Sequence, residues 1–321
     1  MLPENMHRRK IQLIAGTTYT LSLPKEWVKK NNLKEKEEVM LSEKNDRTLV
    51  ISPELIEDKE LNEISINIED YIANIDQILF AIYYLGVENI NLFSKKDITK
   101  DVKTRIRKAL KHMTGIVVSY EDKQKMTIRV LFDKSKAEIN QLIYRISLII
   151  ELSIKNILEQ PEMEEIQMNE DEIDRLFHLM TKIVSLSLVN SSILQSSKID
   201  NVSHIPSYFL IGKRLENIGD NIYHLSGYLM KNKADFENKK LILEFIMDEL
   251  GRSVKYINSK SEKIFEKISQ DSLRKVYDAI SKIKDKTVSS YLEDSIRYLA
   301  DIEEEIVNIS FYNQLIHENK L

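Results

Sequence analysis

Apolar and polar residues alternate along the first fifty residues, which is the pattern of short β-strands. Within residues 10–23, every second residue is apolar on either side of Gly16-Thr17-Thr18, which predicts a hairpin with its turn at these three residues. Residues 38–41 and 48–51 predict a second strand pair, with a turn over residues 43–47.

Between the two predicted hairpins, Pro24 is a favoured start for a short helix over residues 25–30. Asn31 and Asn32 follow, and asparagine tolerates the left-handed conformation that ends a helix. A unit of about fifty residues buries too little apolar surface to be stable by itself, and this chain has no cysteine to reinforce it. We therefore expect an obligate dimer.

The pattern changes after residue 60. Residues 62–132 alternate strand-like and helix-like segments in the order β-α-β-α-β-β, which predicts a small open α/β sandwich. The predicted strands are residues 64–68, 88–93, 116–120 and 126–131, and the predicted helices are residues 71–85 and 98–113. No catalytic signature is visible in this segment.

From residue 133 onward the apolar positions follow the helical period of 3.6 residues. Three long amphipathic helices precede a break at Lys231-Asn232-Lys233, and three more follow it. The predicted apolar faces run over residues 142–157, 176–190 and 211–229, and then over residues 243–268, 273–283 and 288–309. Three helices, a break and three helices indicate an internal repeat. The expected fold class is α+β, with units at residues 1–54, 60–132, 133–232 and 236–318.

Charge is unevenly distributed. The whole chain carries a net charge of -4, but seven basic and two acidic residues leave an excess of +5 on the first 34 residues. Basic side chains near a β module contact nucleic-acid phosphates in many proteins. The alternative is a solvated basic tail, which composition alone favours. The candidate contacts are Arg8, Arg9, Lys10, Lys25 and Lys29.

The amino-acid composition excludes several classes of protein and of functional site. The absence of cysteine excludes disulfide scaffolds, thiolate zinc sites and cysteine nucleophiles. No apolar run reaches the ~18 residues of a membrane span, and no signal peptide is visible. We therefore expect a cytoplasmic protein without membrane insertion. No nucleophile with a matched base and no glycine-rich phosphate loop is apparent, so no enzyme activity is expected.

The third predicted helix carries paired carboxylates. Glu216 and Asp220 are four residues apart and thus neighbours on one face, which lies nearly opposite the apolar stripe. A glycine inside a helix costs about 1 kcal/mol of stability relative to alanine. The presence of Gly219 despite this cost suggests that another group approaches the helix backbone there. Asp171 and Asp174 near the start of the second helix form a similar pair. The alternative is a solvated acidic face.

All-carboxylate ligation favours hard cations such as magnesium or manganese. His224 lies four residues beyond Asp220 and could add a nitrogen ligand, although a surface histidine is the more frequent case. The second trio offers Asp301 and Glu304 on an outward stripe. When the two trios are aligned, Ala300 takes the position of Glu216 and Glu303 takes the position of Gly219. The second trio therefore lacks one of the paired carboxylates, and its metal site is expected to be incomplete.

The run RKIQLIAGTTYTLSLPKEWVKKNNLKEKEEVMLSEKNDRTLVISP, residues 9–53, resembles the SpoVT/AbrB swapped-hairpin domain, with SLPKEW as its most specific part. Asn32 and Lys36 stand where that family usually has glycine. The resemblance implies a homodimeric module that binds DNA with basic residues, here Arg8, Arg9 and Lys10 with help from the helix.

The segments DEIDRLFHLM and RLENIGDNI are similar to the second-helix and third-helix motifs of PhoU proteins. This resemblance implies two three-helix repeats and a multinuclear iron or zinc site that uses Glu216, Asp220, Asp171 and Asp174. It also implies phosphate-uptake regulation through a phosphate-transporter ATPase or a sensor kinase. The alternative is a PhoU-like modulator that does not bind DNA and uses the N-terminal module only to dimerise.

Overall fold

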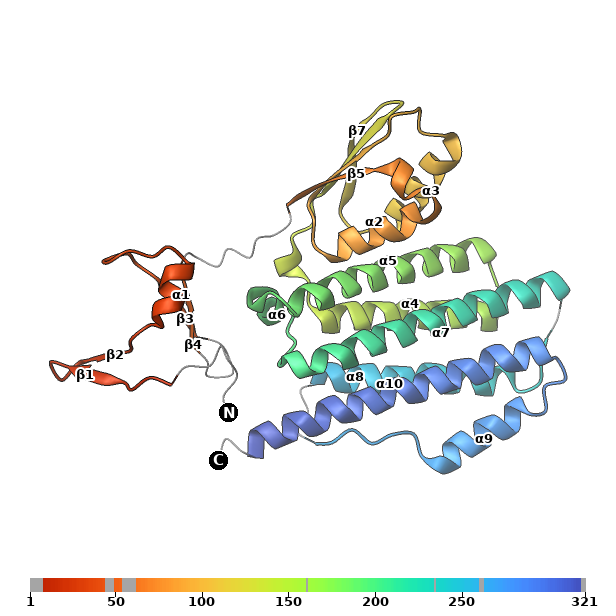
Figure 1. The fold of residues 1–321 in the computed structure, drawn as a ribbon. Coiled ribbons are helices and arrows are strands. Elements are labelled where there is room, and N and C mark those ends of the chain that lie inside the picture. The colour runs from red at the N-terminus through yellow and green to blue at the C-terminus, as the bar shows by residue number, and fades with distance from the viewer. Residues whose placement is uncertain are drawn as a thin grey trace. The chain divides into compact units, whose positions relative to one another are not determined.

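The computed structural model describes residues 8–43, 49–53, 62–159, 161–233, 235–259 and 263–318. The chain divides into two compact units, residues 1–59 and residues 60–321 (Figure 1). The first unit is a small β module, and the second contains an α/β domain and a bundle of long helices. The α+β class expected from the sequence is confirmed.

The N-terminal module contains two hairpins and one short helix. Strands β1 (Gln12–Ile14) and β2 (Thr18–Thr20) pair antiparallel, as do β3 (Met40–Glu43) and β4 (Leu49–Ser52), and α1 (Lys25–Lys30) lies between the hairpins in the chain. The first turn is Ala15-Gly16-Thr17, one residue earlier than predicted, because Ala15 and Gly16 have φ of 51° and 75°. The predicted turn at 43–47 falls largely outside the described residues.

Two residues of the module occupy left-handed conformations where the resemblance expected glycine. Asn32 has φ of 54° and ends the turn that follows α1, as predicted. Lys36 has φ of 71°, a conformation that strains a lysine backbone. The chain therefore keeps the glycine-type geometry at both positions without glycine.

The α/β domain consists of a four-stranded sheet with two helices on one face. Its strand order is β5-β6-β8-β7, with β5 and β6 parallel and the other pairs antiparallel. The elements are β5 (Glu63–Asn67), α2 (Ile75–Tyr84), β6 (Asn89–Phe93), α3 (Lys100–Lys111), β7 (Ile116–Glu121) and β8 (Lys125–Val130). This order matches the predicted β-α-β-α-β-β sequence. Ile90, Leu92 and Ile128 face the helices and are fully buried.

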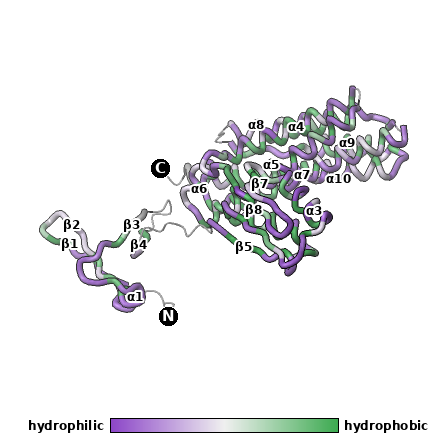
Figure 2. The backbone as a smooth tube through the Cα atoms, turned by 90° about the horizontal axis from the view of Figure 1, so that it is seen from above, coloured by the Kyte–Doolittle hydropathy of each residue, from purple (hydrophilic) through white to green (hydrophobic). Residues whose placement is uncertain are grey.

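Long helices make up the rest of the second unit. They are α4 (Ile139–Glu159), α5 (Met163–Ser187), α6 (Ser191–Ser196), α7 (Ile205–Asn232), α8 (Lys239–Ser259), α9 (Gln270–Ile280) and α10 (Lys286–Glu318). Their apolar stripes meet in one continuous core, and α7 lies along α10 (Figure 1). Figure 2 shows the alternation of hydrophobic and hydrophilic residues along these helices that produced the helical pattern in the sequence.

Two predicted helix boundaries are wrong. The stripe assigned to residues 176–190 ends with α5 at Ser187, and Asn190 instead caps the short α6 by accepting the N–H groups of Ser192 and Ile193. The helix predicted over residues 243–268 ends at Ser259, and residues 264–269 contain no helix or strand. In the second segment the apolar spacing continued because Phe265 and Ile268 are still buried, although not in a helix, whereas Leu188 and Val189 after α5 are exposed.

Gly219 and Gly212 lie where α7 packs closely against α5. A Cβ atom at Gly219 would lie 2.9 Å from Cδ1 of Ile173, and one at Gly212 would lie 2.7 Å from Sδ of Met180. The neighbour that the sequence predicted near the Gly219 backbone is therefore a side chain of α5. Close packing of the two helices brings their polar residues together as well.

The α/β domain contacts the bundle through α2 and α3. Tyr84 of α2 shares a 2.5 Å hydrogen bond with Nδ1 of His178 on α5, and Lys111 at the end of α3 lies 2.5 Å from Asp171. Nζ of the buried Lys182 lies 4.3 Å above the ring of Tyr83. These contacts place the end of α3 beside the predicted carboxylates of α5.

Candidate functional site

The predicted DNA contacts lie at two places in the N-terminal module. Arg8, Arg9 and Lys10 form an exposed basic segment immediately before β1, while Lys25 and Lys29 are exposed one turn apart on α1. Residues four apart lie on one face of a helix, so the two lysines project together. Because these basic side chains are exposed, they can contact DNA phosphates without first breaking a buried ion pair.

The same module buries almost nothing in a single copy. Ser52 is its only buried residue among those described, and α1 has no buried side chain. The two hairpins and their flanks carry large exposed apolar side chains at Ile11, Leu13, Tyr19, Leu41 and Leu49. A single copy of the module has no core that covers these apolar strands. This is expected of a module in which a second subunit supplies the missing half of the core.

Three carboxylates meet between α5 and α7 in the helical bundle. Glu170 and Asp174 lie one turn apart on α5, and Asp220 lies opposite them on α7. One ligand oxygen from each lies within 4.8 Å of the others, and all three residues are half-buried. Sequence reasoning identified Asp174 and Asp220 but missed Glu170, although Glu170 precedes Asp174 by four residues and so shares its helix face.

Like charges at this position change the acidity of each carboxyl group. Burial and the charges of Glu170, Asp220 and Glu216 raise the pKa of Asp174 to about 7. Burial also raises the pKa of Asp220 and that of Glu170, the latter with help from the nearby Asp171. Ionising the whole cluster is therefore unfavourable, and a bound cation would relieve the repulsion.

The other two predicted ligands already have cationic partners. Both carboxylate oxygens of Glu216 accept hydrogen bonds from Lys213, at 2.6 and 2.7 Å, and burial raises the pKa of Glu216. Asp171 pairs with Lys111 of the α/β domain. Of the four residues predicted, the structure brings Asp174 and Asp220 into contact, and it holds Glu216 and Asp171 at the border of the cluster.

A histidine from the α/β domain reaches the same cluster. Nδ1 of His112 lies 3.5 Å from an oxygen of Asp174 and has no hydrogen-bond partner among the described residues. Burial lowers the pKa of His112, which keeps its ring neutral at pH 7. No spacing in the sequence signalled this residue, because it lies directly after α3, about sixty positions before Asp174. His224, the histidine considered from the sequence, is exposed.

A small cavity of about 300 Å³ opens beside His112 and Asp174, between α2, α3 and α5. The ring of His178 stacks on Phe80 at 4.1 Å on one side of it, and burial lowers the pKa of His178 to about 4. Lys108 and Arg105 also line this cavity, with Arg105 held by Asp76 at 2.6 Å. The cavity gives small ions a polar route to the carboxylates.

The second trio of helices does not reproduce the cluster. Asp301 pairs with Arg214 at 2.9 Å, and Glu304 is exposed. Glu303, which replaces the glycine of the first trio, is buried and accepts the backbone N–H of Ile268 at 2.7 Å. Among the described residues, the Glu170, Asp174 and Asp220 group is the only place where three potential ligands converge.

One comparison with known proteins finds a similarity within the N-terminal part of the chain. Residues 12–57 match the family model for antidote-toxin recognition MazE, a bacterial antitoxin. This match fits the SpoVT/AbrB-type module recognised in the sequence and describes only that part of the chain. No curated protein and no solved structure matches the chain significantly. Nothing in these comparisons supports the PhoU resemblance of the helical bundle.

Among the described residues, no helix combines the length and the apolar character needed to cross a lipid bilayer. The long helices instead have one apolar face, directed into the bundle core, and one polar face.

Proposed function

We propose that this protein is a dimeric DNA-binding regulator whose helical body senses or relays phosphate status in the manner of PhoU proteins. The match of residues 12–57 to an antitoxin-type module is the observation that carries the DNA-binding part of the proposal. The exposed basic side chains and the uncovered apolar strands of the module support it further. The phosphate part rests on the PhoU-like motifs of α5 and α7.

DNA binding by this module should depend steeply on salt. The candidate contacts Arg8, Arg9, Lys10, Lys25 and Lys29 are all exposed in each copy. If about six side chains of the dimer contact phosphates, affinity should fall about 10³-fold between 50 and 200 mM salt, because each contact releases condensed counterions.

Fluorescence anisotropy with DNA from the protein's own upstream region and from phosphate-transporter promoters tests this proposal. The triple variant Arg8→Ala, Arg9→Ala, Lys10→Ala should bind weakly and with a shallower salt slope. A matched triple variant at exposed lysines of the α/β domain, Lys95, Lys96 and Lys123, should bind as the wild type does.

Absence of binding above that to random DNA would overturn the transcriptional role. The module would then serve only to dimerise, and the body would act directly on a phosphate-transporter ATPase or a sensor kinase. Equal losses in the two triple variants would instead indicate a general charge effect without a defined DNA interface.

We also propose that Glu170, Asp174 and Asp220 bind a divalent cation. Three half-buried carboxylates with raised pKa values fit such an ion, since the ion would neutralise their repulsion. Oxygen donors alone favour magnesium or manganese, whereas the PhoU resemblance implies iron or zinc. The ion would fix α5 against α7, and this junction would be the sensing element of the body.

Calorimetric titration of chelator-treated protein with manganese, zinc and ferrous iron measures this binding. Asp174→Asn should abolish it, because the variant removes a ligand charge at constant shape. Asp171→Asn is the matched control, since Asp171 is held by Lys111 and should change affinity little. Equal affinities in the two variants, or no saturable binding to the wild type, would contradict the proposal.

The name of the matched family favours neutralisation of a toxin as a second candidate function. Such a role predicts that a protein partner co-purifies with the chain in a fixed stoichiometric ratio. If a protease site is inserted within residues 54–61 and cleaved, this partner should separate from the helical body. DNA binding that persists in the complete absence of any co-purified partner supports the first proposal instead.

A further inference from the structure

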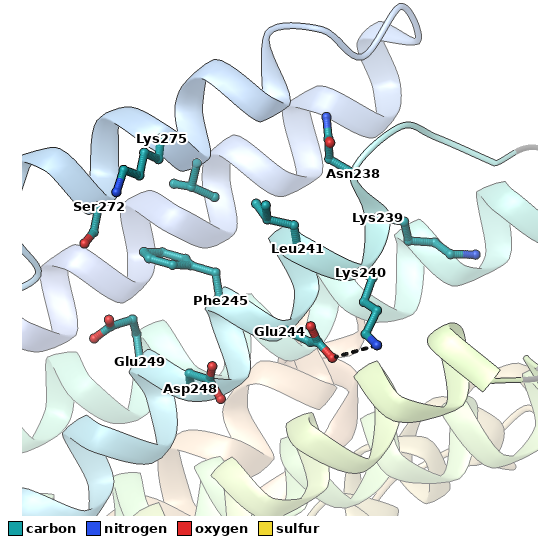
Figure 3. Close-up of a pocket in the computed structure, with 11 residues that line it drawn as sticks. Asn238, Lys239, Lys240, Leu241, Glu244, Phe245, Asp248, Glu249, Ser272 and Lys275 are labelled. Carbon is teal, nitrogen blue, oxygen red and sulfur yellow. Dashed lines mark ion pairs between the residues drawn. The ribbon is translucent and has the colours of Figure 1, made fainter.

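Apolar side chains lie uncovered both in a groove between α8 and α9 and along strand β7 of the α/β domain. The groove has a volume of about 770 Å³ and exposes Leu241, but lysines and acidic residues both line it (Figure 3). Its charges therefore select no partner. Strand β7 is more selective, because its backbone and its side chains together restrict what can bind there.

Strand β7 ends the sheet on one side and has β8 as its neighbour there (Figure 1). Among the described residues, no backbone group of Ile116–Glu121 forms a hydrogen bond outside the sheet. The N–H and C=O groups along the outer edge of β7 therefore have no partner within the described part of the chain. Another strand is the structure that satisfies such a row of groups.

The side chains of β7 are uncovered on both faces of the sheet. The four central residues of the strand are exposed, with Val117, Val118 and Tyr120 at 45%, 39% and 52%. Charged residues or proline commonly protect an edge strand from pairing, but neither interrupts the run from Ile116 to Tyr120. The edge is thus apolar and open to a second strand.

A bulge in β7 decides which of its side chains share a face. Val117 pairs with Arg129 of β8 and Tyr120 pairs with Thr127, because Ser119 is an extra residue without an opposite partner. Arg129 and Thr127 alternate with the buried residues of β8, so they lie on the face away from the helices. Val117 and Tyr120 therefore point to the same uncovered face, although they are three positions apart.

This spacing makes the edge complementary to itself. When two copies of β7 pair antiparallel around a two-fold axis perpendicular to the sheet, Val117 of each copy lies opposite Tyr120 of the other. An aromatic side chain opposite a β-branched one is a favourable cross-strand pair. Ile116 then lies opposite Glu121, so no like charges face each other. The bulges of the two copies meet at the axis and twist both strands equally.

We infer that β7 pairs antiparallel with β7 of a second copy, which joins two four-stranded sheets into one continuous sheet of eight strands. The inference rests on the dimer proposed above, because paired N-terminal modules hold a second copy at a far higher local concentration than any other strand. The α/β domain thereby supplies a contact between subunits that is separate from the N-terminal module.

Distances between spin labels test this pairing in the full-length protein, whose chain has no cysteine of its own. Nitroxides on Lys125→Cys and, separately, on Ser65→Cys occupy exposed positions of β8 and β5, away from the paired edge. With a spacing of about 4.8 Å between strands and 3.4 Å between residues, the two copies of Lys125 should lie roughly 25 Å apart and those of Ser65 roughly 34 Å apart.

Substitutions at the edge check the register. Val117→Glu and Tyr120→Lys should each lower the equilibrium constant for pairing about 10-fold, because each removes both copies of the cross-strand pair. The double variant should restore pairing, since each new carboxylate then lies opposite a new ammonium group. Leu85→Glu changes an apolar residue of the same domain that is 66% exposed, and this matched control should leave both distances unchanged.

The mass measured by light scattering separates this inference from the proposed dimer. A dimeric mass without distances of roughly 25 and 34 Å overturns the inference and leaves the N-terminal dimer standing. A monomeric mass overturns both. Equal losses in Leu85→Glu and Val117→Glu, or a double variant that pairs no better than the single variants, also overturn the inference. Because Val117 and Tyr120 are both exposed, these variants keep the fold of the domain.

Discussion

The carboxylate of Glu303 is predicted to hold the segment before α9 in place. It is fully buried on α10, accepts the backbone N–H of Ile268 at 2.7 Å and forms an ion pair with Arg252 of α8. Glu303→Ala removes both interactions and leaves a buried N–H without a partner. Removing one partner of a fully buried ion pair costs about 3–5 kcal/mol, and here the side chain of Arg252 is 38% exposed.

The lower end of that range is expected here. Arg252 keeps Glu249 at 2.6 Å and the carbonyl oxygen of Glu266, so its charge is not left without partners. Burial also raises the pKa of Glu303, which means that holding it ionised is itself costly. We therefore expect Glu303→Ala to lower the free energy of unfolding by about 3 kcal/mol.

Urea unfolding followed by far-ultraviolet circular dichroism measures this loss. Glu303→Gln is the matched control, since its amide oxygen still accepts from Ile268, and it should cost only about 1 kcal/mol. Hydrogen exchange at the Ile268 amide should accelerate in the alanine variant and change little in the glutamine variant. A loss below about 1 kcal/mol in Glu303→Ala, or equal losses in the two variants, would refute the reasoning.

Two further substitutions test the packing. His204 is buried with neither ring nitrogen hydrogen-bonded among the described residues, so His204→Phe should raise stability by about 1 kcal/mol at pH 7. Burial lowers the pKa of His204. As pH falls below about 6.5 the unfolded chain therefore binds the extra proton first, and thermal melts should show a larger loss in the wild type than in His204→Phe. Gly115 has φ of 77°, and a Cβ there would lie 2.6 Å from that of Phe132, so Gly115→Ala should cost about 2–3 kcal/mol in urea unfolding. An unchanged midpoint in either variant would contradict the corresponding argument.

Periodicity predicted the helices and strands well where local and tertiary preferences agree. Residues 25–30 form α1 as expected, because a proline start and an asparagine end are local signals. The segment before α9 was misassigned because Phe265 and Ile268 are buried at helical spacing while the backbone forms neither helix nor strand. That conformation is fixed by Arg252 and Glu303, which lie far away in the sequence.

The candidate site could be predicted only in part for a similar reason. Spacing within one helix identified Asp174 and Asp220, and the same rule would have identified Glu170. Spacing cannot show which lysine of another element reaches Asp171, nor that His112 crosses from the α/β domain to Asp174. Contacts of this kind depend on how α3 packs against α5, which no local pattern encodes.

The near absence of buried side chains in the N-terminal module has a consequence for how the regulator responds to its own abundance. If a second subunit supplies the missing core, folding of the module and association of two chains form a single equilibrium. The population of the competent form then rises with the square of chain concentration at low levels. A twofold change in synthesis would give about a fourfold change in occupied DNA sites, a steepness that requires no ligand.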